Sequence, residues 1–267
     1  MHFPERSLAT DKLSRAILAR NPNGKAVVFI HGFGGNALST WSKFDSLLPD
    51  EIQGEGHDLL FYGYDGLRSD MVSSATLFLQ FLDELFSRGE EIVNSVLPPA
   101  AQRPSGFAFS EILIAAHSLG APVARWALLM AHDQQRKWVS RTQMVLFAPA
   151  HRGANVVKIA LLSVTGFRAM QVLAGFARFH SPLIDQLAPD SLYLKELQAR
   201  VSAAVGNATS HYLLAKAVLI AQREHVVINL PFPGDPYPIA VPDSDHFSVC
   251  KPQSPTDSPL RRICDLL

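Results

Sequence analysis

Residues 116–120, Ala-His-Ser-Leu-Gly, place the hydroxyl of Ser118 between small residues at the end of an apolar run. A serine on a sharp turn between a strand and a helix exposes its hydroxyl, and small flanking residues let the two elements pass close together. Alanine stands where a Gly-x-Ser-x-Gly pattern has its first glycine, and it adds only a methyl group. The spacing therefore predicts a nucleophilic serine on a strand-to-helix turn, the arrangement called a nucleophile elbow.

A serine hydroxyl is a weak nucleophile until a base takes its proton, so Ser118 requires a histidine. Among the histidines that follow Ser118, His246 is the best candidate base. It comes after the last predicted strand, in a loop at 242–247, from which it could swing over the serine. The others fall on predicted helices, at strand ends or in a helical insertion, and they are His132, His151, His180, His211 and His225.

An acidic residue must in turn orient His246, and several carboxylates compete for this role. Glu224 directly follows a predicted strand end, where the acid of such a triad belongs, and it gives the chain order serine, acid, histidine. Asp243 is the second choice, and Asp185 lies in the insertion. Asp245 adjoins His246, and neighbouring side chains in an extended loop point apart. We therefore rank Glu224 first and Asp243 second.

Attack on a carbonyl would create an oxyanion that needs two backbone N–H donors. Leu119, the residue after the nucleophile, supplies one donor at the start of its helix. We expect Phe33 to supply the second, because it lies in a glycine-rich turn, His-Gly-Phe-Gly-Gly at 31–35, after an apolar strand. His31 is expected to pin this turn by hydrogen bonds. His117 is expected to pack or to form hydrogen bonds at the elbow, because it adjoins the serine too closely to act as its base.

Apolar runs predict the strands that would position these groups, at residues 25–30, 57–62, 111–117, 142–148 and 216–221. Helical patterns separate them at 37–48, at 69–97 and from the elbow to about residue 137. This alternation predicts a mainly parallel sheet covered on both faces, a three-layer α/β architecture. Residues 151 to about 213 interrupt this alternation of strands and helices because they are helix-rich. We expect one domain over 1–267, with a helical lid inserted at about 151–213.

Composition limits the class of partner and the compartment. Lys plus Arg and Asp plus Glu both number 24, so the net charge is zero and no basic excess predicts nucleic-acid binding. Charged residues make up 18%, under the roughly 25% typical of globular domains, while apolar residues reach 48%. Cys250 and Cys264 are too few for a disulfide framework and lack zinc-ligand spacing. The N-terminus has no signal-peptide pattern. We expect a cytoplasmic protein without a metal or organic cofactor.

The most hydrophobic stretch, at 156–179, lies in the predicted lid and has an apolar stripe at helical spacing. Its members are Ile159, Leu162, Val172, Leu173 and Phe176. Such stripes usually pack in a core. Alternatively, this one could cover an acyl-chain tunnel or make transient contact with a membrane surface, where Arg168 and Arg178 would meet anionic head groups. The interspersed polar residues make the stretch a poor membrane span.

Five blocks within residues 25–252 carry a resemblance to a known family. They are His31-Gly32-Phe33-Gly34-Gly35-Asn36 with Trp41 following, Tyr62-Gly63-Tyr64-Asp65, Ala116-His117-Ser118-Leu119-Gly120, Ala148-Pro149-Ala150-His151-Arg152-Gly153 and Asp245-His246-Phe247-Ser248-Val249-Cys250-Lys251-Pro252. Together they resemble the α/β-hydrolases of the lipase-like and esterase-like group. Within it, the chain is most similar to families related to the glycosylphosphatidylinositol inositol-deacylases and to serine-active-site-containing proteins. The last block resembles the catalytic-histidine region of these relatives, whereas Gln-Arg-Glu at 222–224 departs from the usual Gly-Asp at the acid position.

These inferences predict a carboxylic-ester hydrolase that forms an acyl-enzyme with an acyl or lipid-like ester. Ser118 would attack the carbonyl, while His246 takes and later returns the proton. Glu224 would orient His246, and the N–H groups of Phe33 and Leu119 would hold the oxyanion. An acyltransferase or a thioesterase would use the same groups. A non-catalytic interaction module with the same fold is the other alternative, and the intact Ser118 and His246 speak against it.

Overall fold

The computed structural model describes residues 1–8, 13–52, 56–66, 69–155, 182–206 and 210–267. Its strands are β1 (Arg6–Ser7), β2 (Arg15–Ile17), β3 (Lys25–Ile30), β4 (Asp58–Tyr62), β5 (Glu111–His117), β6 (Thr142–Phe147), β7 (Ala215–Arg223) and β8 (Ile239–Asp245). The described strands form an eight-stranded sheet in the order β1-β2-β4-β3-β5-β6-β7-β8. Neighbouring strands in the order β4-β3-β5-β6-β7-β8 are parallel, and β2 is antiparallel to both β1 and β4.

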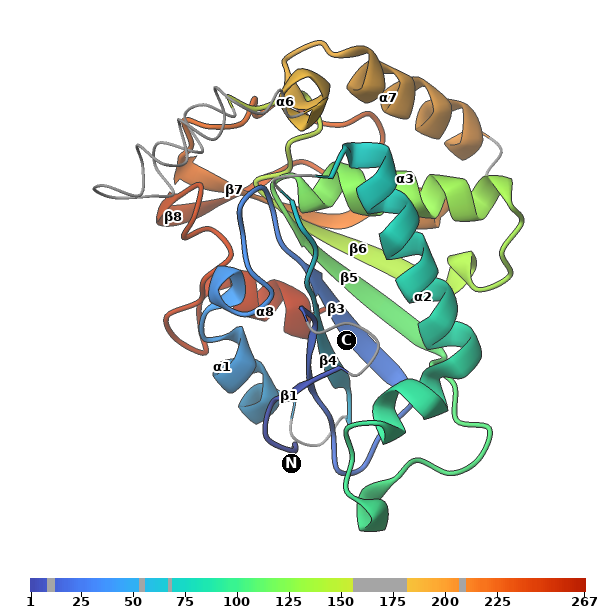
Figure 1. The fold of residues 1–267 in the computed structure, drawn as a ribbon. Coiled ribbons are helices and arrows are strands. Elements are labelled where there is room, and N and C mark those ends of the chain that lie inside the picture. The colour runs from blue at the N-terminus through green and yellow to red at the C-terminus, as the bar shows by residue number, and fades with distance from the viewer. Residues whose placement is uncertain (9–12, 53–55, 67–68, 156–181, 207–209) are drawn as a thin grey trace.

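Helices cover both faces of this sheet (Figure 1). The α-helices are α1 (Phe44–Glu51), α2 (Met71–Asn94), α3 (Gly120–Asp133), α6 (Pro182–Leu187), α7 (Leu192–Val205) and α8 (Ser258–Cys264). Short 3-10 helices are η1 (Ser39–Trp41), η2 (Pro99–Ala101), η3 (Val139–Arg141) and η4 (His211–Leu213). Helices α2 and α3 pack together on one face, and α1 and α8 pack together on the other. The predicted three-layer architecture with a mainly parallel sheet is confirmed.

The central strands are mostly apolar because both of their faces are covered. Residues 26–30 of β3 and 112–117 of β5 are all buried. A tilted cluster of rings fills the α1 side of the sheet, where Phe29 lies 5.1 Å from Trp41 and 5.4 Å from Phe44 between ring centroids. This packing holds the carboxyl ends of β3 and β5 rigidly side by side.

The structure corrects the sequence prediction at several boundaries. The helix expected over 37–48 is divided into η1 and α1, because Lys43 adopts a left-handed conformation with φ of 69° between them. The helix after the elbow ends at Asp133, short of residue 137. The loop predicted at 242–247 is wrong for its first residues, because β8 extends to Asp245. As an edge strand, β8 is mostly polar and tolerates Pro242, so it lacks the apolar pattern by which strands are recognised.

The predicted lid is described only in part. Helices α6 and α7 lie between β6 and β7 in the chain, and α7 packs against α3, burying Leu194, Leu197 and Val201. Residues 156–181, which contain the apolar stripe, lie outside the described residues. Among the helices of the described part, none combines the length and the apolar character needed to cross a membrane.

The chain order creates a crevice at the carboxyl ends of β3 and β5. From β3 the chain passes to β4 on one side, then crosses to β5 on the other side of β3. The connections that follow β3 and β5 therefore leave in opposite directions, and such a switch point is where open parallel sheets bind ligands. The glycine-rich turn at 31–35 follows β3, and Ser118 follows β5, so both lie at this point.

Candidate active site

Ser118 occupies a strained turn between β5 and α3. Its φ of 53° lies in the left-handed region, which costs a non-glycine residue on the order of 1–3 kcal/mol. Three backbone hydrogen bonds hold it there. The Ser118 N–H donates to the Phe147 carbonyl at 2.9 Å, and its own carbonyl accepts from Ala121 at 3.1 Å and Ala150 at 3.2 Å. The strained conformation turns the side chain out of the sheet, as the predicted elbow requires.

Two glycines allow the turn after β3 and the start of α3 to meet. A Cβ atom on Gly32 would lie 2.7 Å from the Cβ atom of Ser118. A Cβ atom on Gly120 would lie 2.5 Å from the Ile30 carbonyl oxygen and 2.6 Å from that of His31. Real Cβ atoms do not approach backbone atoms this closely, so any side chain at either position would force the two segments apart.

We predict that Gly120→Ala lowers the free energy of unfolding by about 1–3 kcal/mol, because the added methyl group overpacks backbone against backbone. Gly206→Ala is the matched control. Gly206 has right-handed φ and ψ at the end of α7, and its nearest contacts would be 3.5 Å away. We expect this control to change stability by less than about 0.5 kcal/mol. Urea unfolding of both variants measures the difference, and equal stabilities would contradict the close approach.

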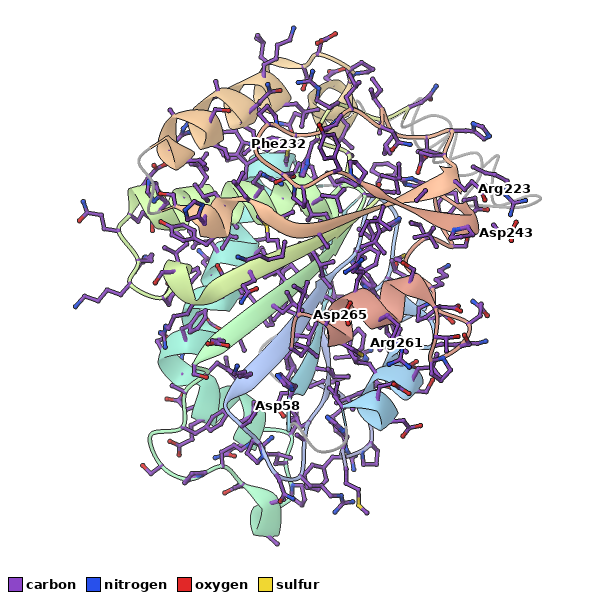
Figure 2. All side chains as sticks on the ribbon, turned by 180° about the vertical axis from the view of Figure 1, so that it is seen from behind. Asp58, Arg223, Phe232, Asp243, Arg261 and Asp265 are labelled. Carbon is purple, nitrogen blue, oxygen red and sulfur yellow. The ribbon has the colours of Figure 1, made fainter. Side chains whose placement is uncertain are left out.

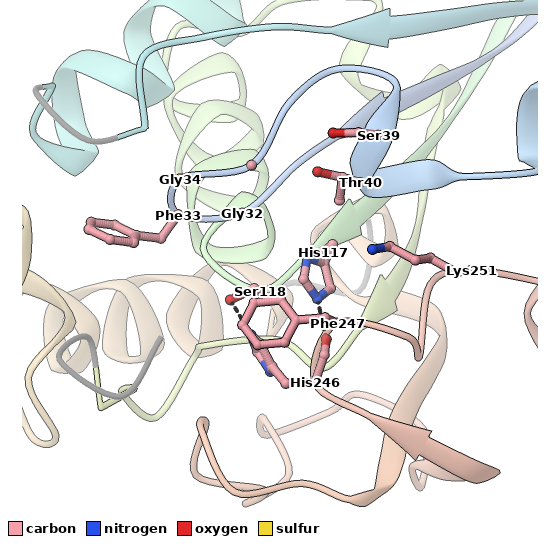
Figure 3. A pocket seen from close by; sticks show the side chains of 11 residues that line it. Gly32, Phe33, Gly34, Ser39, Thr40, His117, Ser118, His246, Phe247 and Lys251 are labelled. Atoms are coloured by element: carbon pink, nitrogen blue, oxygen red, sulfur yellow. Dashed lines mark hydrogen bonds between the residues drawn. The ribbon is translucent and has the colours of Figure 1, made fainter. Parts of the chain in front are cut away.

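His246 links Ser118 to Glu224 through two hydrogen bonds. Its Nε2 atom lies 3.0 Å from the Ser118 hydroxyl oxygen (Figure 3). Its Nδ1 atom lies 3.0 Å from Oε2 of Glu224. The His246 and Glu224 side chains are only 2% and 1% exposed. An ionised carboxylate can only accept, so Nδ1 carries the hydrogen that faces Glu224, and Nε2 is left to accept the serine proton.

Glu224 is held in the ionised form that this arrangement needs. Burial by itself would raise its pKa, but the hydrogen bond and charge of His246 and two backbone N–H donors together lower the pKa below its ordinary value. The donors belong to Val226 and Val227, which lie 2.7 and 3.2 Å from Oε1. Both carboxylate oxygens therefore have partners, which fixes the orientation of Glu224 toward the imidazole.

Comparison with known proteins addresses the fold directly. No family model matches the sequence, and no curated protein matches it at a significant level. Solved structures do match. The mature form of the Bacillus licheniformis lipase BlEst2 is 13% identical, with a TM-score of 0.52 and 87% of each chain covered. An α/β hydrolase, MGS-MChE2, from the metagenome of lagoon sediments at Mar Chica, Morocco, is 11% identical, with a TM-score of 0.51 over 98% of this chain and 97% of its own.

The chain has the α/β-hydrolase fold. The phospholipase PlaB of Legionella pneumophila, in its complex with thio-NAD, is a further match at 15% identity and a TM-score of 0.50, covering 74% of this chain and 38% of PlaB. These identities are low, so the resemblance to inositol-deacylase-related families remains a sequence prediction. Within the hydrolase fold, Ser118 follows β5 and Glu224 follows β7, whereas His246 comes directly after β8.

The other carboxylates considered from the sequence make no hydrogen bond to the His246 imidazole in the described part of the chain. Asp243 has φ of 54° and is exposed at the sheet edge, where Arg223 donates to its carbonyl (Figure 2). Asp245 accepts from the N–H groups of residues 247 and 248 and from the Ser248 hydroxyl, so it stabilises the turn that follows β8. Asp185 is exposed in α6. Of the acids weighed, the structure brings Glu224 to the imidazole.

The turn after β3 is held by His31, as expected. The Nδ1–H of His31 donates to the Gly32 carbonyl at 2.8 Å, and its Nε2 accepts from the Tyr64 N–H at 3.4 Å. Burial lowers the pKa of His31 to about 4, so the ring is neutral at physiological pH and can play both parts. Phe33 lies in this turn and lines the same cavity as Ser118, while Leu119 immediately precedes α3. Both predicted oxyanion donors thus belong to segments that flank the serine.

His117 forms a hydrogen bond at the elbow, with a partner that sequence reasoning did not find. Its Nε2–H donates to the backbone carbonyl of His246 at 2.8 Å, across 129 residues of chain. Burial, followed by the nearby His246, lowers the pKa of His117 far below its ordinary value, so the ring stays neutral. His117 therefore ties the segment that carries His246 to the end of β5 and does not compete for the serine proton.

A cavity of about 350 Å³ opens directly on Ser118 and His246 (Figure 3). Its other lining residues are Gly32, Phe33, Gly34, Gly35, Ser39, Thr40, His117, Phe247 and Lys251. Sequence reasoning noted Lys251 and Phe247 only as part of a resembling block and gave them no role. Within the described part of the chain, no group of three or more His, Cys, Asp or Glu side chains is arranged to hold a metal ion.

Proposed function

We propose that this protein is a serine hydrolase that cleaves carboxylic esters. The observation that carries the proposal is the chain of hydrogen bonds from the Ser118 hydroxyl through His246 to Glu224, with both links at 3.0 Å and the base nearly excluded from water. A buried imidazole between a hydroxyl and an ionised carboxylate is the arrangement by which serine becomes nucleophilic. The elbow strain at Ser118 and the open cavity beside it are consistent with this use.

The reaction would run in two halves. In the first, Ser118 attacks the ester carbonyl while Nε2 of His246 takes the hydroxyl proton, and the resulting imidazolium gives that proton to the departing alcohol. In the second, His246 takes a proton from water, the hydroxide attacks the acyl-enzyme, and Ser118 regains its proton as the acid leaves. Glu224 stabilises the imidazolium in both halves. The N–H groups of Phe33 and Leu119 are the proposed donors to the oxyanion.

We predict that a fluorophosphonate probe labels the folded protein at Ser118 alone. The probe reacts only with a serine whose proton a base removes, so labelling reports the activated state rather than mere exposure. Mass spectrometry of the labelled peptide identifies the site. Ser39→Ala is the matched control, because Ser39 is an exposed serine in the same cavity. Ser118→Ala should lose labelling and Ser39→Ala should keep it, whereas labelling that survives in Ser118→Ala would defeat the proposal.

A further inference from the structure

Lys251 places a positive charge in the wall of the catalytic cavity. Its backbone is well anchored, since its N–H donates to the Ser248 carbonyl at 2.9 Å and its carbonyl accepts from the Gln253 side chain at 3.1 Å. Both neighbours in the chain, Cys250 and Pro252, are buried. The side chain extends from this anchored segment toward Thr40 and His117 (Figure 3). The ammonium group is thus part of the cavity wall, on the side of Thr40 and His117.

No carboxylate neutralises this charge in the described part of the chain. Ion pairs bind other lysines, such as Lys25 to Glu111 at 2.7 Å and Lys195 to Asp190 at 3.5 Å, but none among the described residues joins Lys251 to an acid within 4 Å. The described residues that line the cavity include no Asp or Glu. Glu224 accepts hydrogen bonds from His246 and from two backbone N–H groups, so both of its oxygens already have partners other than Lys251.

The positive charge of Lys251 affects other groups that line the cavity. Burial is the main cause of the lowered pKa of His117, and the positive charge of Lys251 adds to it. Neutral donors lie near the same wall, because Ser39 and Thr40 line it with their hydroxyl groups. A cation and hydroxyl groups around one part of a cavity form a site for an anion, which would replace the water that otherwise solvates the ammonium.

We propose that the cavity is selective for esters that also carry an anionic group, a carboxylate or a phosphate, and that Lys251 determines this specificity. The proposal rests on the hydrolase function proposed above. A charge-assisted hydrogen bond between the anion and Lys251 would hold the substrate with its ester carbonyl at Ser118. A bond of this kind is worth about a 10- to 100-fold difference in kcat/KM between charged and neutral esters.

Two matched pairs of substrates test the proposal and separate its two anions. The first pair is 4-nitrophenyl valerate and the mono-4-nitrophenyl ester of glutaric acid, which differ by a terminal carboxylate. The second is a short-chain monoacylglycerol and the same compound phosphorylated on the glycerol. The wild type should hydrolyse the charged member of at least one pair about 10- to 100-fold more efficiently than the neutral member. The pair that shows the preference identifies the anion.

Variants at position 251 assign that preference to the ammonium group. Lys251→Met should lower the ratio of kcat/KM between charged and neutral esters to about one, and Lys251→Arg should keep the preference. Lys216→Met is the matched control, because Lys216 is exposed on β7 outside the cavity and its loss changes the net charge equally. Added salt should reduce turnover of charged esters only.

The outcomes also separate this proposal from the one on which it rests. Turnover of neutral esters with no charge preference, or a preference that Lys251→Met retains, would overturn the role of Lys251 while leaving the hydrolase intact. Equal losses for charged and neutral esters in Lys251→Met would also overturn it, because a general structural defect would then be the cause. Failure of the wild type to hydrolyse any ester, together with the absence of fluorophosphonate labelling, would defeat both proposals.

Discussion

Replacing His246 by glutamine is expected to lower kcat for a short-chain aryl ester by about a million-fold, the scale of loss when the base of a serine triad is removed. The glutamine amide is similar in size and can still form hydrogen bonds, but it cannot take the proton that the imidazole Nε2 accepts at 3.0 Å from Ser118. Stopped-assay kinetics at high enzyme concentration, with a melting curve to verify folding, measure the effect.

His225→Gln is the control for this experiment. His225 adjoins Glu224 in the chain but is exposed, and no hydrogen bond joins it to Ser118. We expect its kcat to stay within about threefold of the wild type, as for a surface substitution away from the site. If instead His246→Gln retained more than a hundredth of the activity, proton transfer would not pass through this imidazole and the proposed mechanism would fail.

Glu224→Gln is expected to reduce kcat by about ten-thousand-fold while KM changes little. The amide of glutamine can present its NH₂ group to Nδ1 of His246, which stabilises the tautomer with its hydrogen on Nε2 and leaves no acceptor for the serine proton. It also removes the negative charge that stabilises the imidazolium. Asp243→Asn is the comparison, because Asp243 is the acid that the sequence ranks second and it is exposed at the sheet edge. A large loss in Asp243→Asn alone would reverse our assignment.

The pH dependence of the wild type follows from the same carboxylate. The pKa of Glu224 lies below its ordinary value of 4.5, so the carboxylate is ionised throughout the neutral range. A group whose pKa is lowered on folding stabilises the native state above its unfolded pKa and loses this contribution as the pH falls through the folded pKa. Glu224 therefore remains able to orient His246 until the pH falls below the ordinary range of a glutamate carboxyl.

Much of the candidate site could be predicted from the sequence because its signals are local. An apolar run that ends between small residues predicts Ser118 as the nucleophile, and a position just after an apolar strand predicts Glu224 as the acid. Both patterns reflect how a central parallel strand is built, since such a strand is apolar on both faces and its loop follows directly. The limits of β3 and β5 were correct to the residue for this reason.

The remaining features depend on contacts between distant segments and leave no local pattern. β8 was missed because an edge strand is mostly polar. His117 contacts the backbone of His246 across 129 residues, and only the assembled sheet brings the two together. Nothing in the sequence predicts a function for Lys251 itself, and the proposed role follows from the cavity that this residue lines. Residue type alone does not distinguish a lysine that lines a cavity from one on the outer surface.

The position of β8 at the rim of the sheet has a further consequence. In the described sheet this strand pairs only with β7, and it ends at the residue directly before His246, so an edge strand delivers the imidazole. Ser118, by contrast, follows β5, which pairs with β3 on one side and β6 on the other. If β8 separated locally from β7, His246 would move away from Ser118 while the rest of the core kept its native packing. The durability of the catalyst would then be set by this last strand pair and not by the global melting of the domain.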